Sequence, residues 1–399
     1  MHLLRWLSLF GVLFFLGLII KNPWLVLFSV ALTSLVLISA AWGSHSLDRV
    51  TYRRKWRYRR GFPGEKIGLQ IEIHNDKILP ISWLHIKDPW PVQAGPIDEN
   101  ELAPSYIRDQ GFLINLCSLR WHERVLRNHM LLLRKRGVYA VGPAELSSSD
   151  LFGMFTKEQI QPAQEYITVF PELLPVNFHL LPTKNPFGDQ NTRRRLFEDP
   201  NLPIGVRPYQ PMDDFRRIHW PATARSGNLQ VKVYQPVSSQ VMVICLNVST
   251  ASQAWLGTDS GMLEQLVKTA ATLAFQGAQG GYSVGLISNG CLAHSDTPFN
   301  IQPGRSKDQL AHLLQALASV TPYVSAPFEN YLIKTMPRLP YGAVLVIVTA
   351  VVKPELAETL VRLKRYRSHT SLISLDSIPP PDIPGVQLMH LPNFRSPSG

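Results

Sequence analysis

Residues 207–234 read RPYQPMDDFRRIHWPATARSGNLQVKVY, a stretch dense in charged and aromatic side chains. Asp213 comes four residues before Arg217, a spacing that makes opposite charges neighbours on a helical turn. Gly227 is of the residue type that ends helices in a left-handed conformation, and residues 229–233 then alternate apolar and polar as a half-buried strand does. The stretch therefore predicts a turn, a helix, a second turn and a strand.

The spacing within this stretch resembles the signature of the domain of unknown function 58 family. Weaker resemblances follow at Arg136–Tyr139 and at Asp150–Gly153. Pro221 departs from the family pattern, and because proline removes a backbone donor it predicts that the helix kinks or restarts there. The signature positions are Arg207, Tyr209, Asp213, Asp214, Arg216, Arg217, His219, Trp220, Arg225 and Lys232.

The resemblance implies a bacterial, membrane-tethered protein that partners AAA+ ATPases of the MoxR type. It also implies a β-sandwich-like domain followed by a von Willebrand factor A-like domain, which is a doubly wound α/β sheet. The chain contains no Gly-x-x-x-x-Gly-Lys-Ser/Thr phosphate-binding loop, so any ATP hydrolysis must come from the partner.

The role of the signature stretch is open between three interpretations. Adjacent acids and arginines on a surface helix commonly form a solvated ion-pair face, in which each pair contributes little. Alternatively, the stretch is a clamp between domains, in which Ile218 and Trp220 are buried and Asp214 pairs with Arg217. In the third interpretation Asp214 orients His219 as the general base of a hydrolase, but no nucleophile or metal-ligand set accompanies them at a recognisable spacing. We therefore expect no catalytic residue in this stretch.

Composition bounds the class of protein. At 399 residues the chain has room for two or three domains, and an apolar fraction of 45% excludes a disordered tail. Its 32 prolines and 25 glycines favour a partly β protein with many turns. The three widely spaced cysteines allow neither a disulfide framework nor a zinc pattern, which suits a reducing compartment.

Two apolar runs, residues 6–20 and 24–42, stand near the N-terminus and are separated by Lys-Asn-Pro. Each could span a bilayer, the second more comfortably, and tryptophans stand at the ends of the runs, where indole rings favour the membrane interface. A secretory signal peptide is disfavoured because Lys-Asn-Pro is a poor cleavage context and a second long run follows at once. The pattern predicts a transmembrane helical hairpin over residues 1–43.

Basic residues follow the second run closely. From Asp48 to Arg60 the chain carries seven Arg or Lys residues and a single acid, and the positive-inside rule places such a segment in the cytoplasm. Both termini and the bulk of the chain are then expected on the cytoplasmic side of the bacterial inner membrane. Next to an anionic leaflet this segment is expected to bind anionic lipids, through Arg49, Arg53, Arg54, Lys55 and Arg57.

Nucleic acid is not the expected partner of this basic segment. Tyr52, Trp56 and Tyr58 interleave with the arginines as aromatic residues do in proteins that bind single strands. Membrane electrostatics accounts for the same positive charge without nucleic acid. A nucleic-acid-binding protein is therefore kept only as a weaker alternative.

Residues 44–175 are expected to form a β-rich, sandwich-like domain. Residues 67–73 alternate apolar with polar or small side chains, and shorter segments of the same kind recur up to residue 169 between prolines and glycines. Spacing alone leaves a small barrel open. Residues 176–238 are expected to be an arginine- and proline-rich connector that carries the signature stretch.

The hydrophobic period changes from residue 239 onward. Residues 241–246 form a near-continuous apolar run, as in a strand buried on both faces. Strands alternating with helices predict a doubly wound parallel sheet over residues 239–399. The other expected strands are 282–287, 342–352 and 370–375, and the expected helices are 260–278, 307–320, 327–336 and 354–366.

This α/β pattern resembles a von Willebrand factor A domain, whose metal ligands follow the first and fourth strands. The corresponding positions are Asn247, Ser249 and Thr349, and Ala251 and Ala350 stand where further ligands are expected. Mg²⁺ prefers hard anionic oxygens, and the leading carboxylate is here an amide. We therefore expect no metal and no other cofactor, while the strand ends remain a candidate protein-binding face.

The sequence thus predicts a membrane-tethered cytoplasmic interaction protein rather than an enzyme, working with a MoxR-type ATPase in the assembly or maturation of protein complexes. One alternative is a membrane-bound hydrolase that uses Asp214 and His219. A weaker alternative is a nucleic-acid-binding protein, which oligonucleotide binding that falls steeply with salt would favour.

Overall fold

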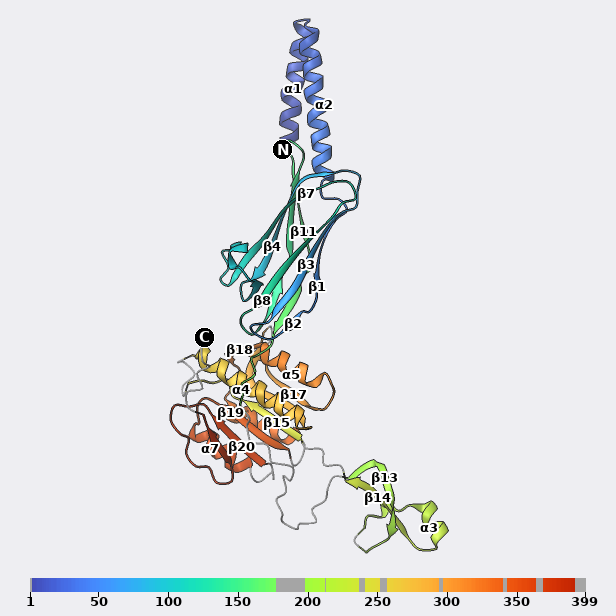
Figure 1. Ribbon diagram of the computed structural model, residues 1–399, viewed down its shortest axis with the longest axis vertical. Coiled ribbons are helices and arrows are strands. Elements are labelled where there is room, and N and C mark those ends of the chain that lie inside the picture. The colour runs from blue at the N-terminus through green and yellow to red at the C-terminus, as the bar shows by residue number, and fades with distance from the viewer. Residues whose placement is uncertain are drawn as a thin grey trace. The chain divides into compact units, whose positions relative to one another are not determined.

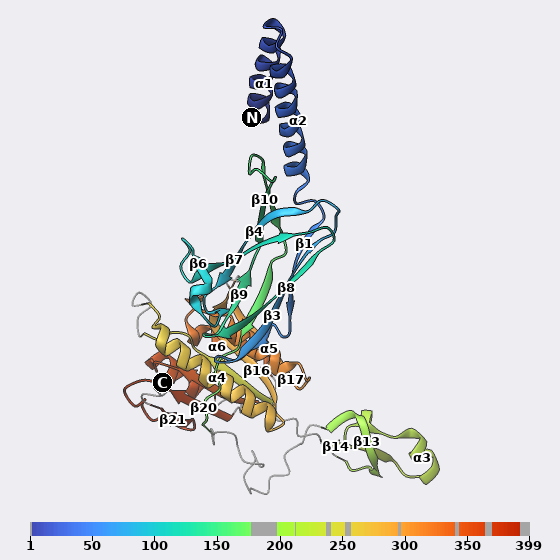
Figure 2. The same cartoon turned by 45° about the horizontal axis from the view of Figure 1, so that its top comes forward.

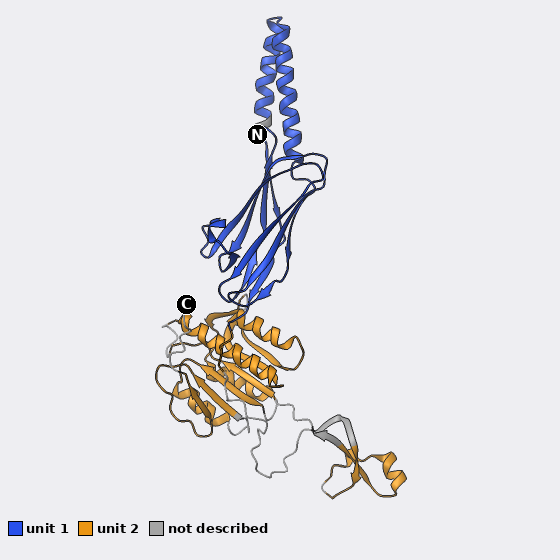
Figure 3. Ribbon diagram, in the orientation of Figure 1, with its two compact units in different colours: residues 1–172 blue, residues 173–399 orange. Residues whose placement is uncertain are grey.

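Two compact units make up the chain, residues 1–172 and residues 173–399 (Figure 3). The computed structural model describes residues 2–176, 198–211, 213–236, 241–251, 257–293, 297–339, 343–363 and 369–391.

The first unit begins with two helices, α1 (His2–Ile19) and α2 (Pro23–His45), which pack side by side (Figure 1). The side chain of Asn22 accepts a hydrogen bond from the backbone N–H of Trp24 and so caps the start of α2. Among the described residues, α2 is the helix long and apolar enough to cross a membrane, whereas the apolar part of α1, Leu4–Ile19, is shorter. Both predicted apolar runs are therefore helical.

A body of three β-sheets follows these helices. The first sheet joins β1 (Val50–Trp56), β3 (Lys66–Asn75), β8 (Arg124–Leu133) and β5 (Ala94–Pro96). The second joins β11 (Thr156–Gln161), β10 (Ala144–Ser149), β4 (Ile81–Pro91), β7 (Gln110–Leu119) and β6 (Leu102–Pro104), with a short 3₁₀ helix, η1 (Glu99–Glu101), before β6. The third joins β2 (Arg60–Gly61), β12 (Glu165–Val169) and β9 (Gly137–Val141).

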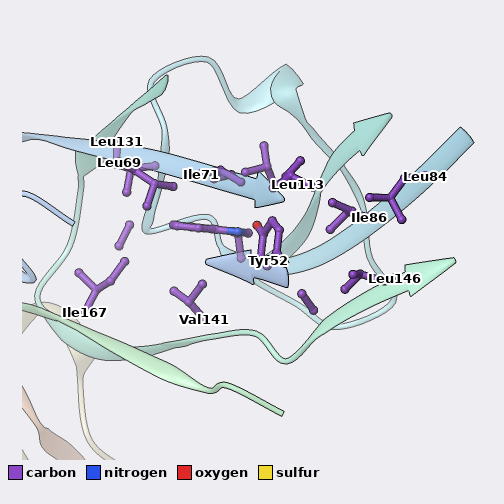
Figure 4. Packing of buried hydrophobic residues seen from close by; sticks show 14 of the residues in the cluster. Tyr52, Leu69, Ile71, Leu84, Ile86, Leu113, Leu131, Val141, Leu146 and Ile167 are labelled. Carbon is purple, nitrogen blue, oxygen red and sulfur yellow. The ribbon is translucent and has the colours of Figure 1, made fainter. Parts of the chain in front are cut away.

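One hydrophobic core serves all three sheets (Figure 4). Alternate residues of β3, among them Ile71, point into it because side chains alternate between the two faces of a strand. Ile86 from β4 and Ile167 from β12 meet them there, each fully buried. The β-rich body predicted for residues 44–175 is present.

A buried ion pair crosses this core. The Arg54 guanidinium donates to both carboxylate oxygens of Asp88, at 2.8 and 2.6 Å, and the hydroxyl of Tyr52 and the indole N–H of Trp90 donate to the same carboxylate. Arg54 is buried and Lys55 pairs with Glu72 at 2.6 Å, so the expectation that Arg54 meets lipid headgroups is wrong. The reason is that residues 50–56 form a strand whose alternate side chains face the core.

The second unit contains a mixed, mainly parallel sheet in the order β17-β16-β15-β19-β20-β21. Strands β16, β15, β19, β20 and β21 are parallel neighbours, and β17 and β18 pair antiparallel with β16. The strands are β15 (Val241–Leu246), β16 (Ser283–Leu292), β17 (Pro298–Gly304), β18 (Val320–Val324), β19 (Val344–Thr349), β20 (His369–Ser374) and β21 (Gln387–His390).

Helices lie between these strands in the chain. α4 packs against β15, β16 and β19, while α6 and α7 share a core cluster with strand residues such as Val243 and Ile347. Of the elements described here, β17, β18 and β21 were missed by the sequence analysis, and the strand expected at 342–352 is shorter. The helices are α4 (Ser260–Gln279), α5 (Gln309–Ala318), α6 (Phe328–Thr335), η4 (Met336–Arg338) and α7 (Pro354–Leu363).

A two-stranded sheet with helical turns between its strands contains the signature stretch. It consists of β13 (Glu198–Pro208), the 3₁₀ turn η2 (Phe215–Arg217), α3 (Trp220–Ser226) and β14 (Gln230–Pro236). The helix begins at Trp220 with Pro221 in its first turn, which agrees with the restart predicted from the proline. The expected connector was wrong over residues 198–208, which form a strand, and its residues 177–197 lie outside the described residues.

Candidate functional site

The carboxyl ends of neighbouring parallel strands bring the predicted polar positions together. Asn247 follows β15 and Thr349 ends β19, and the side-chain N–H of Asn247 donates to the hydroxyl of Thr349 at 3.0 Å. Thr349 in turn donates to the backbone carbonyl of Val351 at 2.8 Å. Ser249 stands two residues after Asn247, and its backbone N–H donates to the Asn247 side-chain oxygen at 3.1 Å. All three positions named from the sequence thus lie at one edge of the sheet.

Asn289, near the end of β16, completes this network and was missed by the sequence analysis. Its side-chain N–H donates to the side-chain oxygen of Asn247 at 3.1 Å, and its own side-chain oxygen accepts the backbone N–H of Val248 at 3.0 Å. The available signal was the polar pair Ser288-Asn289, which follows the apolar end of a strand at the same edge. We call Asn247, Ser249, Asn289 and Thr349 the amide network.

The oxygens of the amide network are already committed to protein partners. The side-chain oxygen of Asn247 accepts two hydrogen bonds, from Ser249 and Asn289, and the residue is 4% exposed, whereas Asn289 and Thr349 are fully buried. Carboxylates, the ligands that Mg²⁺ prefers, are not part of the network. The described residues contain no cluster of three or more His, Cys, Asp or Glu side chains that could hold a metal. The groups present therefore do not fit a divalent cation.

Exposed apolar side chains border the amide network. The backbone N–H and the hydroxyl of Ser325 donate to the backbone carbonyl of Asn289, at 3.0 and 2.7 Å. Directly before Ser325, the side chains of Tyr323 and Val324 are 73% and 41% exposed. The hydrogen bonds of Ser325 thus hold the segment that carries Tyr323 and Val324 next to the amide network.

In the signature stretch an ion pair joins Arg207 to Asp213. Two guanidinium nitrogens meet the two carboxylate oxygens at 2.6 and 2.5 Å, the bidentate geometry that suits arginine. The backbone N–H of Gln210 adds a bond to the same carboxylate at 2.8 Å. The hydrogen bonds from Arg207 and Gln210 hold the pKa of Asp213 below its usual value.

Asp214 and His219 cap helical turns. The carboxylate of Asp214 accepts the backbone N–H of Arg216 at 3.0 Å, and Nδ1 of His219 accepts the backbone N–H of Ala222 at 3.0 Å. The clamp predicted between Asp214 and Arg217 is therefore corrected: Asp213 takes the bidentate arginine, and Asp214 binds a backbone amide. An acid at an N-cap position accepts a hydrogen bond from a free backbone N–H group of the turn that follows.

The aromatic residues of the stretch are exposed, contrary to the prediction that Trp220 is buried. Trp220 and Phe215 are 67% and 68% exposed, while Ile218 is 4% exposed and bridges to Val231 in β14. The ring of Tyr209 lies 5.4 Å from that of Phe215. The remaining signature residues are spread along the stretch: Arg216 in η2, Arg225 in the last turn of α3, and Lys232 opposite Val206 in β14.

Comparison with known proteins bears on the second unit most directly. Residues 205–384 match the family model described as "Protein of unknown function DUF58". The uncharacterized protein YeaD of Bacillus subtilis (strain 168) is 21% identical over 270 residues, which are 67% of this chain and 62% of that protein. The match therefore spans about three fifths of the length of that relative.

Two solved structures are faintly similar to this chain. The sporulation control protein Spo0M of Bacillus subtilis has a TM-score of 0.19 at 14% identity, over 30% of this chain and 49% of that one. A β-glucosidase of Listeria innocua has a TM-score of 0.19 at 10% identity, over 30% and 16% of the two chains. At these TM-scores neither likeness carries an argument. Residues 205–384, which include the signature stretch and the amide network, are similar to DUF58 proteins of unknown function.

Proposed function

We propose that this chain is a non-enzymatic interaction protein, tethered to the bacterial inner membrane, that works with an AAA+ ATPase of the MoxR type. The ATPase is the partner implied by the resemblance of the signature stretch. In the proposal α1 and α2 cross the membrane as a hairpin, so that both termini and the bulk of the chain lie in the cytoplasm. Support comes from the apolar composition of α2 and from the seven basic residues between Asp48 and Arg60.

The sheet of the second unit is, in this proposal, a von Willebrand factor A-like doubly wound domain. The parallel pairing of β16, β15, β19 and β20 supports it, as do the helices that separate these strands in the chain. Ligand sites of open α/β sheets lie at the carboxyl ends of the strands. That edge carries the amide network in this chain.

The observation that carries the proposal is that the amide network uses its own polar groups internally and stands beside exposed Tyr323 and Val324. A metal-dependent edge would leave anionic oxygens free for a cation and for a ligand bound through it. Here the exposed groups are the side chains of Tyr323 and Val324, which stand beside the hydrogen-bonded amide network. Aromatic anchors on a rigid surface are what protein interfaces use.

The hydrolase alternative lacks comparable support. A general base needs a free nitrogen within reach of the proton that it removes, and the orienting acid must hydrogen-bond to the other ring nitrogen. Nδ1 of His219 instead accepts a backbone N–H, and the carboxylate of Asp214 accepts another. Both side chains have structural partners that explain their presence.

Capture of partners by the full-length protein in detergent tests the proposal. We expect an AAA+ ATPase of the MoxR type to co-elute, to an extent that depends on ATP, and to be identified by mass spectrometry. Tyr323→Ser should reduce this capture, whereas Tyr106→Ser, at an exposed tyrosine of the first unit, should not. Absence of such an ATPase with and without ATP, or equal effects of the two substitutions, would contradict the proposal.

A further inference from the structure

The loop between β10 and β11, residues 150–155, reaches alongside the end of α2 (Figures 1 and 2). The buried carboxylate of Asp150 fixes its shape by accepting the backbone N–H groups of Phe152 at 3.1 Å and Phe155 at 2.8 Å. Within this closed turn the side chains of Leu151 and Phe152 are 63% and 61% exposed. The loop thus presents two large apolar side chains that are mostly exposed.

Contacts at the base of the loop hold it to α2. Lys157 donates to the backbone carbonyl of Ser44, at 2.6 Å, and to the carboxylate of Asp48, at 2.6 Å. At Gly43 an added Cβ would lie 2.7 Å from the backbone carbonyl oxygen of Phe155, so helix and loop meet backbone to backbone. The loop therefore has a fixed place along the helix.

An apolar cavity of about 100 Å³ lies between this loop and α2. Leu35, Ile38 and Trp42 line it from the helix, and Leu151 and Phe152 line it from the loop. The indole N–H of Trp42 is buried and has no hydrogen-bond partner among the described residues. An apolar groove of this kind fits a hydrocarbon chain, and the indole ring of Trp42 is of the type that favours the membrane interface.

The position of the groove along α2 indicates that a lipid hydrocarbon chain fills it. Leu35 stands ten residues before the helix end at His45, about 15 Å along the axis. The side chains of Leu35 and Ile38 are 41% and 65% exposed, so the groove is continuous with the outer apolar surface of α2. When α2 spans a bilayer, this surface faces lipid hydrocarbon, and the groove opens into the same leaflet.

We propose that Leu151 and Phe152 insert into the bilayer beside α2, and that a phospholipid acyl chain fills the groove between them and the helix. The inference rests on the membrane span of α2 in the proposed function. It adds a second membrane contact to the first unit, beside the helices. Two contacts fix the depth and the tilt of the β-sheets relative to the membrane.

Fluorescence quenching in vesicles of palmitoyl-oleoyl phosphatidylcholine tests the inference with the full-length protein. An environment-sensitive NBD fluorophore is attached to one introduced cysteine at a time. Leu151→Cys and Phe152→Cys report on the loop, and Ile38→Cys reports on the span. Ile160→Cys, in β11 and 63% exposed like Leu151, is the matched control.

The native thiols leave this labelling selective. Cys245 and Cys291 are buried, and burial raises the pKa of the Cys117 thiol, so that fewer thiolates form at neutral pH. Wild-type protein labelled in parallel gives the remaining background. Each introduced cysteine replaces an exposed side chain, so folding does not depend on the residue removed.

Lipid that carries a nitroxide on its upper acyl chain should quench the fluorophore at positions 151, 152 and 38 and leave the one at 160 bright. Quenching at 38 with full emission at 151 and 152 would overturn the inserted loop and leave the anchor in place. Full emission at all four positions would overturn the anchor and the inference with it. Equal quenching at 160 would show that the fluorophore itself seeks lipid, which also contradicts a specific role of the loop.

Discussion

The side chain of Asn289 donates to the side chain of Asn247 at 3.1 Å across 42 positions of sequence, and so ties the end of β16 to the end of β15. The other half of the Asn289 amide accepts the backbone N–H of Val248. Neither asparagine has water as an alternative partner, because the two side chains are buried. The strand ends are thereby locked together, which gives the exposed residues nearby a rigid support.

Asn289→Ala should loosen this edge of the sheet. The change leaves the N–H of Val248 and the oxygen of Asn247 each short of a partner, at a cost of about 1–3 kcal/mol per buried group. Hydrogen exchange of peptides from β15 and β16 in the full-length protein measures this, since exchange reports on each unit separately. Asn330→Ala, at an exposed position of α6, is the control and should leave the same peptides unchanged.

Magnesium should have no effect on the wild-type sheet, and Asn247→Asp should create a dependence on it. The substitution buries a carboxylate without a cation, which costs about 2–4 kcal/mol. Added Mg²⁺ should recover part of that loss, because the new carboxylate stands beside Ser249 and Thr349. Hydrogen exchange with and without Mg²⁺ gives both values, and a stoichiometric, micromolar magnesium site in the wild type would contradict the expectation.

Asn247 and Thr349 were named together from the resemblance to a von Willebrand factor A domain, and they meet in the structure because the carboxyl ends of neighbouring parallel strands lie at one edge of the sheet. The sequence analysis missed Asn289 because the apolar pattern ends at residue 287, whereas β16 continues to Leu292 through the polar pair Ser288-Asn289. Buried Asn289 is tolerated in the strand because its amide is hydrogen-bonded to Asn247 and Val248. A search for apolar residues alone cannot find such a position.

The errors in the signature stretch have equally local causes. Three prolines within Glu198–Pro208 argue against a strand, yet a two-stranded sheet consists of edges alone, where proline is tolerated. The aromatic character of Trp220 suggested burial, but Pro221 fixes the start of α3 at Trp220, where the ring stays exposed. Amino-acid composition predicts neither the strand Glu198–Pro208 nor the exposure of Trp220. Both depend on which other segments pack against these short elements.

Asp213 should titrate below its usual pKa of 3.8, and Arg207→Gln should move it back toward that value. Because the folded pKa is the lower one, the ion pair stabilises the stretch above the unfolded pKa, and that stability is lost as pH falls through the folded value. The carboxyl ¹³C resonance of Asp213 reports the titration directly. Arg225→Gln, which removes an arginine from the last turn of α3, is the matched control and should leave the midpoint in place.

Trp220→Ala and Ile218→Ala should separate binding from stability in the signature stretch. Trp220 is exposed, so its loss should change local stability by less than about 0.5 kcal/mol. Ile218 is buried against β14, and its truncation should cost about 2–4 kcal/mol. Hydrogen exchange of peptides from β13 and β14 measures stability, and capture of the ATPase measures binding. Reduced capture by the Trp220 variant at unchanged exchange would mark an interface, whereas faster exchange in that variant would contradict a surface role.

The orientation of the membrane anchor is the last testable point. The seven basic residues between Asp48 and Arg60 resist transfer across the membrane, so this segment should stay in the cytoplasm and the turn between α1 and α2 should face outward. An impermeant maleimide should therefore label Ile20→Cys in intact cells and Tyr58→Cys only after lysis, since both side chains are exposed. Labelling of Tyr58→Cys in intact cells would reverse the topology and, with it, the access of a cytoplasmic ATPase to the amide network. If neither position is labelled before lysis, α2 does not cross the membrane, and the anchor fails while the sheet edge can still bind a partner.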